Sequence, residues 1–495
     1  MKTEKLILNY QRRGIKLSVS DNKLHFSAPQ NILTDEDKDI LKKNKKEIIK
    51  FLLDHTESEI IVDEEDKYEK FPLTDIQLSY LVGQDNVYKF GGTNCKIYTE
   101  IEYEQIELNK AQYAWEQVIK YNDMLHAVIN QEGTQEILSS YTVPQIVFSD
   151  LSDMENAEVI IAQKRESLTK KQYRVGTWPL FDVEITKLKN KYILHISLDM
   201  LVADFVSINV ILNEFEEVYY NGKLSFKQQL SFRDIVLYKE SLKKTVNGKK
   251  KYEEDKKYWE KRIPRLSEVP EFPVVEQQEK EVLFTQYKFF LESDEYEKLC
   301  DLAKNFQLTP SSLILTAYAE ALRKISKNQS FCIDVTMVDR PPFHPSIDRV
   351  IGDFTTANIL EVEDLDYTNY FEKAKKIQHR LWEDLSHNSF SSKEVLREMG
   401  KRIKKEITVP AVYTSTLGAV KYSNQRKGKI LYTISQTPQV LIDCQVLELE
   451  KGVRLNWDVR LGVFPKGLIE EAFESFRELI YRIIDNNTLD ISLES

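Results

Sequence analysis

One run of the chain, KYILHISLDMLVADFVSINVIL, is almost entirely apolar yet contains two aspartates five positions apart, Asp199 and Asp204. The segment YILHISL alternates and is rich in strand-forming residues, whereas FVSINVILNEFEEVYY has apolar residues at helical spacing. The sequence therefore predicts a strand followed by a helix, with both aspartates at the junction. An ionised carboxylate is costly to bury without a partner. Either Asp204 caps the helix while Asp199 faces solvent, or the two belong to a site.

Length and charge narrow the class of protein. A chain of 495 residues is too long for one hydrophobic core. The net charge of −10 and the lack of a basic cluster with interleaved aromatic residues argue against a nucleic-acid partner. There is no apolar stretch of membrane-spanning length, and MKTEKLILNY lacks a signal core. We therefore expect a cytoplasmic protein without membrane contact.

The motifs of several common enzymes are missing. The four cysteines are scattered, with no CxxC pair and no histidine at ligand spacing, so we expect no metal site. A glycine-rich phosphate loop, a GxSxG elbow and an HExxH helix are also absent from the sequence. These absences remove the common nucleotide-binding, serine hydrolase and metalloprotease interpretations.

Two compositional seams divide the chain. The first, TESEIIVDEEDKYEK, is dominated by acidic residues, as in a solvated linker. The second, IPRLSEVPEFPVVE, contains prolines where neither a helix nor a sheet can continue. The sequence thus predicts an N-terminal unit at 1–55, a linker at 56–70, a lobe at 71–262, a seam at 263–276 and a second lobe at 277–495.

The N-terminal unit has its own pattern. LILNYQRRG predicts a helix ending at Gly14, IKLSVSDNKLHFSA predicts two strands around Ser20-Asp21-Asn22, and LTDEDKDILKKNKKEIIKFLLD predicts an amphipathic helix capped by Thr34. This order resembles the N-terminal docking domains of hybrid polyketide and nonribosomal peptide synthetases. The resemblance implies a small α+β domain whose hairpin edge binds the C-terminal tail of an upstream synthetase or polyketide synthase subunit. The alternative is a basic cap that only solubilises the terminus.

The rest of the chain also resembles a known family. The spacing SLDMLVADFVS is similar to the DxxxxDxxS signature of heterocyclization domains of nonribosomal peptide synthetases. Further segments agree with that family in the same order: FPLTDIQLSYLVGQ, GGTNCKIYTEIE, WPLFDV, SFRDIVLY, TPSSLILTAYAEAL, IGDFTTANIL, PAVYTSTLG and SQTPQVLIDCQV. The resemblance implies an α/β fold of two chloramphenicol-acetyltransferase-like lobes in a V, with a tunnel between them.

The resemblance also suggests roles for the residues of the opening run. Condensation domains, which are related, carry a catalytic histidine in HHxxxDG, and here Asp199 and Met200 take the two histidine positions. A thioether has no titratable proton, so Met200 cannot act as a general base. By resemblance Asp204 pairs with Arg340 and Ser207 supports it locally. Asp199 is either scaffold or part of the site lining.

Resemblance places the chemistry on Thr414 and Asp443, with Gln436 as a polar neighbour. Such a domain first joins an upstream acyl thioester to the amine of a carrier-bound Cys, Ser or Thr. It then cyclodehydrates the product to a thiazoline or oxazoline. A carboxyl that takes up and returns a proton suits both the addition of the side chain to the amide and the loss of water. Burial beside VLI would raise the pKa of Asp443 toward the value that such proton transfer needs. The resemblance implies substrates that are attached as thioesters to the phosphopantetheine of upstream and downstream carrier proteins. It implies no cofactor bound by the chain itself.

Two alternatives stay open from the sequence. One is a condensation domain that stops at the linear amide, and the other is a non-catalytic module that binds docking tails or carriers. Some positions also depart from the family pattern: Gln84 follows the first motif in place of arginine, and Tyr121, Asn122 and His126 replace basic residues. These side chains cannot reproduce the bidentate contacts of arginine.

Overall fold

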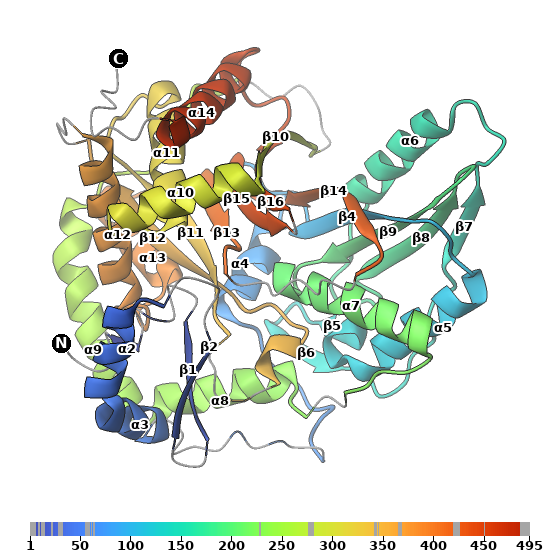
Figure 1. Cartoon of the computed structure of the whole chain (residues 1–495), viewed down its shortest axis with the longest axis horizontal. Coiled ribbons are helices and arrows are strands. Elements are labelled where there is room, and N and C mark those ends of the chain that lie inside the picture. The colour runs from blue at the N-terminus through green and yellow to red at the C-terminus, as the bar shows by residue number, and fades with distance from the viewer. Residues whose placement is uncertain are drawn as a thin grey trace.

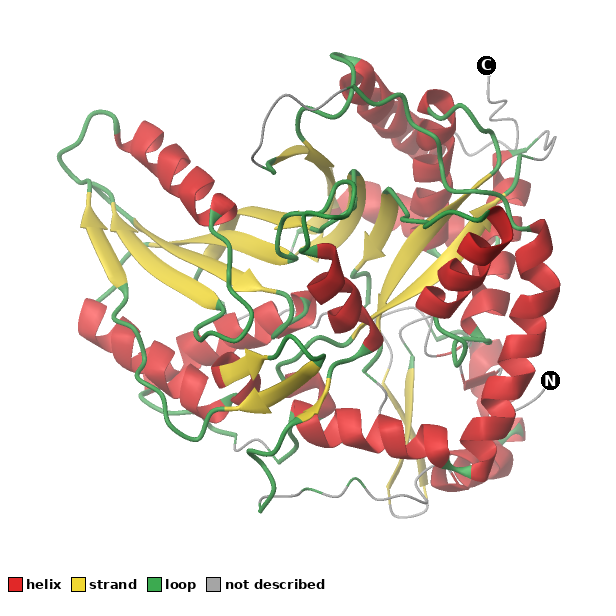
Figure 2. Cartoon of the chain, turned by 180° about the vertical axis from the view of Figure 1, so that it is seen from behind, coloured by secondary structure: helices red, strands yellow, loops and turns green. Residues whose placement is uncertain are grey.

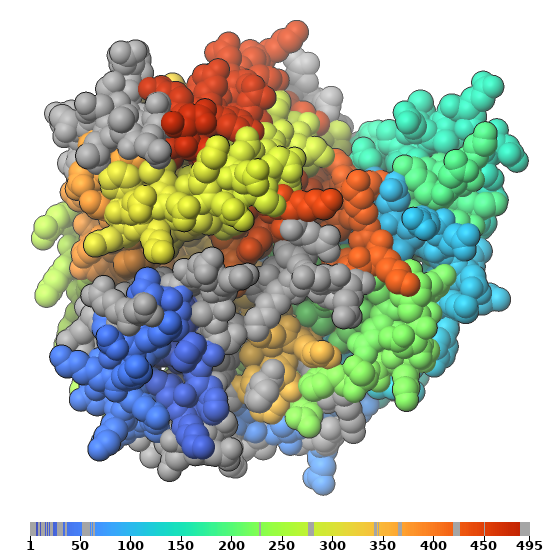
Figure 3. All heavy atoms as spheres, viewed as in Figure 1, coloured from blue at the N-terminus to red at the C-terminus, as the bar shows by residue number. Residues whose placement is uncertain are grey.

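The structure is a computed structural model that describes residues 6–7, 10, 15–20, 23–27, 33–54, 60, 62, 65–226, 229–275, 282–340, 344, 346–364, 369–418, 426–449 and 451–485. A small N-terminal unit lies beside two larger lobes that meet at the centre of the molecule (Figure 1). Sheets run through both lobes, and helices cover them (Figure 2). The surface is hollowed between helix α14 (Leu468–Asp485) of one lobe and helix α6 (Ala157–Lys170) of the other (Figure 3).

The described part of the N-terminal unit includes the hairpin of β1 (Lys16–Ser20) and β2 (Lys23–Ser27) and the helices α2 (Asp35–Lys43) and α3 (Lys45–Asp54), and Leu6, Ile7 and Tyr10 are helical. The predicted hairpin and the predicted cap at Thr34 are confirmed, since the Thr34 hydroxyl accepts the Asp37 N–H at 3.1 Å. The single helix predicted after Thr34 is wrong in one respect. Asn44 interrupts it, because its side-chain amide donates to the Ile40 carbonyl at 2.8 Å. The predicted helix end at Gly14 and the turn residues 21–22 lie outside the described residues.

The N-terminal lobe contains a five-stranded sheet of order β14-β4-β9-β8-β7 and a three-stranded sheet of order β3-β6-β5. Its own strands are β3 (Phe71–Pro72), β4 (Lys96–Tyr103), β5 (Ala127–Ile129), β6 (Thr134–Ile137), β7 (Val147–Asp150), β8 (Phe181–Lys187) and β9 (Tyr192–Asp199). Its helices are α4 (Asp75–Gly83), α5 (Leu108–Tyr121), η1 (Asp123–His126), α6, α7 (Phe205–Asn221) and α8 (Phe232–Lys244). Helix α9 (Val246–Arg262) follows α8 and packs on the C-terminal lobe, where the Trp259 indole N–H donates to the His387 carbonyl at 2.9 Å. Helices α5 and α7 lie on one face of the five-stranded sheet, and α6 lies on the other (Figure 1).

The C-terminal lobe is built on a six-stranded sheet of order β10-β16-β15-β13-β11-β12. Its strands are β10 (Phe284–Glu292), β11 (Phe331–Val338), β12 (Thr355–Val362), β13 (Ala411–Ser415), β15 (Ile442–Leu449) and β16 (Gly452–Arg460). Its helices are η2 (Ile263–Arg265), α10 (Ser293–Asn305), α11 (Pro310–Ile325), η3 (Ile347–Arg349), α12 (Tyr370–Leu385), α13 (Ser392–Ile403) and α14. Helices α11 and α14 pack together over the apolar core of this lobe.

The two lobes exchange segments of chain. Strand β14 (Lys429–Gln436) comes late in the sequence but pairs with β4 at the edge of the N-terminal sheet, where Thr433 lies opposite Thr99. Ile347 and Phe354 likewise belong to the core of the N-terminal lobe. Residues on the boundary between the lobes therefore come from both halves of the chain.

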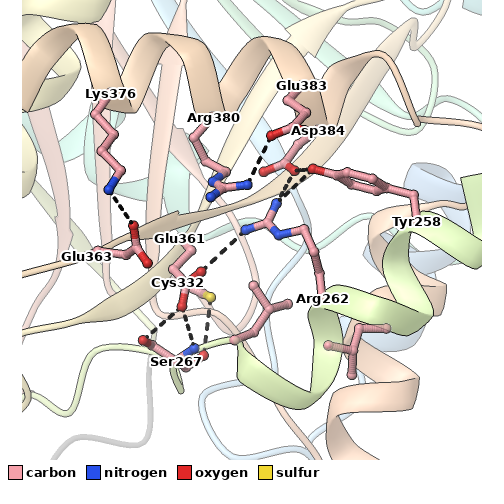
Figure 4. A network of polar contacts seen from close by, with 12 residues as sticks. Tyr258, Arg262, Ser267, Cys332, Glu361, Glu363, Lys376, Arg380, Glu383 and Asp384 are labelled. Carbon is pink, nitrogen blue, oxygen red and sulfur yellow. Dashed lines mark hydrogen bonds and ion pairs between the residues drawn. The ribbon is translucent and has the colours of Figure 1, made fainter.

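The predicted seam after α9 begins with η2, and its other described residues form no regular element. A buried polar network fixes the seam to the C-terminal lobe (Figure 4). Arg262 of α9 is ion-paired with Asp384 of α12 and, at 3.3 Å, with Glu361 of β12. The Ser267 N–H donates to Glu361 at 2.8 Å. Ion pairs and hydrogen bonds to α12 and β12 thus hold the seam, without strand pairing of its described residues.

Candidate active site

One face of the six-stranded sheet is apolar, and the opposite face is polar near its centre. Successive residues of a strand point to opposite faces. The apolar set packs in the lobe core and includes Ile442, Cys444, Val446, Leu455 and Trp457. By register, the polar set contains Thr336, Thr414, Asp443, Gln445, Asn456 and Asp458. We call this set the polar sheet face. Ser435 of β14 hydrogen-bonds to it, so it lies where the two lobes meet.

Thr414 and Asp443, the residues predicted to carry the chemistry, are in contact. They lie on the neighbouring parallel strands β13 and β15, and the Thr414 hydroxyl donates to Asp443 Oδ1 at 3.1 Å. The Thr336 hydroxyl in turn donates to Thr414 at 2.8 Å. This chain of hydroxyl groups directs the Thr414 proton at the carboxylate.

The hydrogen-bond donors to the Asp443 carboxylate are neutral groups. Its Oδ2 accepts from Gln445 Nε2 at 2.7 Å and from the Ser435 hydroxyl at 3.4 Å. Burial raises the pKa of Asp443 to about 7, which confirms the direction predicted from the sequence. A carboxyl with this pKa both holds and releases a proton near neutral pH.

A second carboxylate, Asp458, lies opposite Asp443 across strands β15 and β16 and was missed by the sequence analysis. Its Oδ2 accepts the Ser435 N–H at 2.8 Å and the Ser435 hydroxyl at 3.1 Å. The Ser435 hydroxyl therefore lies between the two carboxylates. Burial raises the pKa of Asp458, and its negative charge contributes to the raised pKa of Asp443.

The sequence contained a signal for the missed residues. In IDCQVLEL and RLNWDVR, polar residues recur at every second position between apolar ones, which places them on one face of a strand. The segment FCIDVTMV shows the same alternation at Asp334 and Thr336. Burial raises the pKa of Asp334 to about 7, and the nearby charge of Asp443 also contributes. A search for this alternation finds Asp334, Gln445 and Asp458.

Asp204 and Arg340 form a buried ion pair at the predicted strand-to-helix junction, which is confirmed by β9 and α7. Arg340 Nη2 donates to the two carboxylate oxygens at 2.9 and 3.1 Å. Asp204 also caps α7, accepting the Ser207 N–H and hydroxyl at 2.7 Å each. The capping interpretation and the ion-pair interpretation are therefore both correct for this residue. We call Asp204, Ser207 and Arg340 the aspartate clamp.

Asp199 is fully buried, so the alternative in which it faces solvent is wrong. Asn94 Nδ2 donates to its Oδ2 at 3.0 Å, and the Leu201 N–H donates to its Oδ1 at 2.9 Å. Burial raises the pKa of Asp199 to about 7. The neighbouring Met200 sulfur lies 3.8 Å from Cys95 Sγ. Asp199 thus fixes the connection after β9, and its two oxygens are both engaged.

The remaining predicted residues belong to elements of the N-terminal lobe or to the strand β14 that joins its sheet. Gln436, the predicted polar neighbour, is buried and is the last residue of β14, next to Ser435 in the chain. Asn122 donates to a carbonyl of α5 at 2.9 Å, and the His126 ring stacks on Tyr141. Gln84 follows the end of α4, and Tyr121 ends α5. Of these departures, Asn122 and His126 are buried in the N-terminal lobe, whereas Tyr121 is exposed.

Neither a metal cluster nor a membrane span is found in the described part of the chain. No group of three or more His, Cys, Asp and Glu side chains there is arranged to hold a metal ion. No helix among the described residues is long and apolar enough to cross a membrane. The four cysteines are free thiols, and Cys95, Cys332 and Cys444 are buried.

The sequence, fold and site together define the class of protein. Residues 67–494 match the condensation domain family, and the chain belongs to it. Residues 4–54 match the TubC N-terminal docking domain. Both resemblances inferred from the motifs are thereby confirmed, as is the condensation-domain fold.

Two relatives match nearly the whole chain, and a third matches most of it. The chain is similar to the EpoB NRPS cyclization-docking bidomain from Sorangium cellulosum, with a TM-score of 0.82, 27% identity and 98% of each chain covered. It is also similar to pyochelin synthetase PchF from Pseudomonas aeruginosa, at 27% identity over 98% of this chain. Phenyloxazoline synthase MbtB from Mycobacterium sp. is 28% identical over 81% of this chain. The chain spans 27% and 34% of the length of these two synthetases.

Proposed function

We propose that this chain is a heterocyclization domain of a cytoplasmic nonribosomal peptide synthetase. It joins an acyl thioester on an upstream carrier to the amine of Cys, Ser or Thr on a downstream carrier. It then closes the side chain onto the new amide to give a thiazoline or oxazoline. The observation that carries the proposal is the contact of Thr414 with Asp443, 3.1 Å apart on the polar sheet face. Similarity to a cyclization-docking bidomain over 98% of the chain supports it.

Ring formation requires a group that takes up and returns protons. The side-chain thiol or hydroxyl adds to the amide carbonyl carbon and loses its proton, while the carbonyl oxygen becomes a hydroxyl. That hydroxyl then leaves as water after gaining a proton, and the nitrogen loses its hydrogen as the C=N bond forms. Asp443 suits both transfers because burial raises its pKa to about 7. Thr414 orients the carboxyl through its hydrogen bond.

The substrates arrive on phosphopantetheine arms of two carrier proteins, which enter the boundary between the lobes from opposite sides. Such an arrangement brings two thioesters together while limiting access of water, which would hydrolyse them. The chemistry assigned to this site needs no cofactor beyond these arms.

The proposal is tested with loaded carrier proteins. The chain is incubated with an acyl-loaded upstream carrier and a downstream carrier loaded with Cys, Ser or Thr in turn, and the products are weighed by mass spectrometry. A product lighter than the linear amide by one water supports heterocyclization. Linear amide alone supports the condensation-only alternative, and no product with any of the three amino acids supports a non-catalytic module.

Residues 1–55 are proposed to dock the C-terminal tail of an upstream subunit. The hairpin of β1 and β2 and the match to a docking domain support this role, and none of the proposed site residues lies there. Deleting residues 1–55 should leave ring formation between excess free carriers unchanged. Transfer from the natural upstream subunit at low micromolar concentration should fall by ~10²-fold or more, because the loss is one of effective concentration. Equal transfer rates with and without the unit contradict this role.

A further inference from the structure

A buried carboxylate outside the polar sheet face, Asp353, is not used by the ring chemistry. Asp353 precedes β12, and its side chain is 1% exposed. Its Oδ1 accepts the Thr355 N–H at 3.0 Å. In the part of the chain that the structure describes, its Oδ2 has no hydrogen-bond partner. A buried carboxylate oxygen is costly to leave without a partner, so this one suggests a ligand that donates to it.

The aspartate clamp holds the residues on both sides of Asp353. Asp204 N–H donates to the Gly352 carbonyl at 3.1 Å, and the Phe354 N–H donates to Asp204 Oδ2 at 3.3 Å. The Ser207 hydroxyl donates to the Gly352 carbonyl at 2.9 Å and accepts the Gly352 N–H at 3.1 Å. The DxxxxDxxS motif therefore fixes the backbone around Asp353 as well as capping α7.

Glycine is required next to Asp353 because the space is filled. A Cβ atom at Gly352 would lie 2.2 Å from the ring of Phe232. The close approach of α8 and the four hydrogen bonds to the clamp leave this segment little freedom to move. Asp353 is thus a preorganised carboxylate and not part of an adaptable loop.

Several titratable and charged groups face Asp353. Burial is the main cause of the raised pKa of Tyr80 and of Cys95, and the negative charge of Asp353 contributes to both. Burial raises the pKa of Asp353 to about 8; the charge of Asp204 adds to this, while Thr355 and Arg340 oppose it. Cys95 Sγ lies 3.7 Å from Thr437 Oγ1, just beyond β14. Gly352 and Phe354 hydrogen-bond to Asp204 at the start of α7 in the N-terminal lobe, and β12 of the C-terminal lobe begins at Thr355, so Asp353 lies where the two lobes meet.

We propose that Asp353 is a catalytic residue for amide formation, with its free Oδ2 accepting an N–H of the acceptor amine. The inference rests on the proposed function, which supplies the two carrier-bound substrates. The amine nitrogen bonds to the acyl carbon, and the carbon–sulfur bond to the upstream pantetheine breaks. Asp353 takes the proton that the nitrogen loses and returns it to the departing sulfur. Amide formation and ring closure thus use different carboxylates.

The other buried carboxylates fit this role less well. Both oxygens of Asp199 accept hydrogen bonds, so neither is available to an amine without loss of a contact. Asp334 also has an oxygen without a partner among the described residues, but by register its side chain lies in one row with Asp443 on the polar sheet face. Its electrostatic coupling to Asp443 links it to the ring-closing group.

The experiment separates the two steps. Amide formation is followed with an acetyl-loaded upstream carrier and a cysteinyl-loaded downstream carrier, and ring closure is followed with a carrier loaded directly with N-acetylcysteine. Asp353→Asn should lower the rate of amide formation by ~10²-fold or more, while ring closure of the preformed amide stays within about threefold of wild type. Asp339→Asn, a half-exposed aspartate near Arg340, serves as the matched control and should change neither rate.

Rescue provides a second readout that a structural role would not give. In Asp353→Ala, added formate should restore part of the amide formation, and it should restore none of the activity lost by Asp443→Asn. Amide formation by Asp353→Asn at the wild-type rate, parallel loss of both steps, or no response of Asp353→Ala to formate would each overturn the inference. If the wild-type chain makes linear amide but no ring, heterocyclization is contradicted. The rate of amide formation in the Asp353 variants can still be compared with that of the wild type.

Discussion

Two sites of this molecule contain buried carboxylates, and they differ in the groups that surround the negative charge. In the aspartate clamp, Arg340 supplies a guanidinium 2.9 Å from Asp204. On the polar sheet face, Asp443 and Asp458 lie opposite one another, and their hydrogen-bond donors include Thr414, Ser435, Gln445 and Gln286, all of them neutral. The first site pairs opposite charges, and the second brings two like charges together.

The difference indicates which site is scaffold and which is chemistry. A guanidinium fork stabilises the ionised carboxylate, and a pair of this kind is fragile when one partner is removed. The seam also contains a buried arginine–aspartate ion pair, Arg262 with Asp384 (Figure 4). Neutral donors and a neighbouring carboxylate instead leave the proton affinity high, so that Asp443 titrates near neutral pH.

The largest expected effect comes from removing the proton carrier of the polar sheet face. Asp443→Asn keeps the size of the side chain but cannot cycle a proton, so ring formation should fall by ~10²–10⁴-fold. Linear amide should accumulate, as measured by mass spectrometry with loaded carriers. The exposed Asp153→Asn is the control and should form the ring normally. Ring formation by Asp443→Asn at the wild-type rate would mean that the proton carrier is assigned to the wrong residue.

Breaking the clamp should instead damage the fold. Asp204→Asn leaves the buried Arg340 guanidinium without its counter-charge, a loss on the order of 3–5 kcal/mol in the free energy of unfolding. Thermal melting should show a lower midpoint, and amide formation and ring closure should both decline. An unchanged melting temperature with loss of ring closure alone would place Asp204 in the chemistry and would remove the contrast between the two sites.

The sequence predicted the local elements of both sites well. Alternating apolar residues and helical spacing placed Asp199 at the end of a strand and Asp204 at the start of a helix, and the structure has both. The family motifs predicted Thr414 and Asp443 as the residues of the chemistry, and these two side chains are in contact. Such features depend on short segments of chain, where periodicity and capping preferences decide the structure.

Relations between distant segments were not predictable in the same way. The exchange of β14 into the N-terminal sheet depends on the pairing of Thr433 with Thr99, far apart in sequence, and no local pattern encodes that pairing. Asp458 was missed for the same reason. Alternation places it on one face of a strand, but only the register of β15 and β16 sets it opposite Asp443. The pairing of Asp204 with Arg340 was predicted from the family resemblance and not from a local pattern.

A smaller effect concerns the dependence of stability on pH. Folded Asp443 keeps its proton up to about pH 7, whereas its ordinary pKa is 3.8, so the native state binds more protons than the unfolded state between these values. The free energy of unfolding of the wild type therefore falls as pH rises through this window. The asparagine variant carries no such proton. Relative to wild type, Asp443→Asn should gain about 1–4 °C in melting temperature between pH 5 and pH 8. A constant difference across that range contradicts the raised pKa.

The smallest effect tests the coupling between the two carboxylates of the polar sheet face. Asp458→Asn removes a negative charge beside Asp443 and leaves Ser435 with an amide oxygen to which it can donate. Because a like charge disfavours ionisation, its removal should lower the pKa of Asp443, and the pH midpoint of ring closure should move down by on the order of one unit. Amide formation, assigned to a different carboxylate, should keep its pH profile. The midpoint is read from ring closure of a carrier loaded with N-acetylcysteine between pH 5 and pH 9, and a profile that matches wild type would show that the two carboxylates titrate independently.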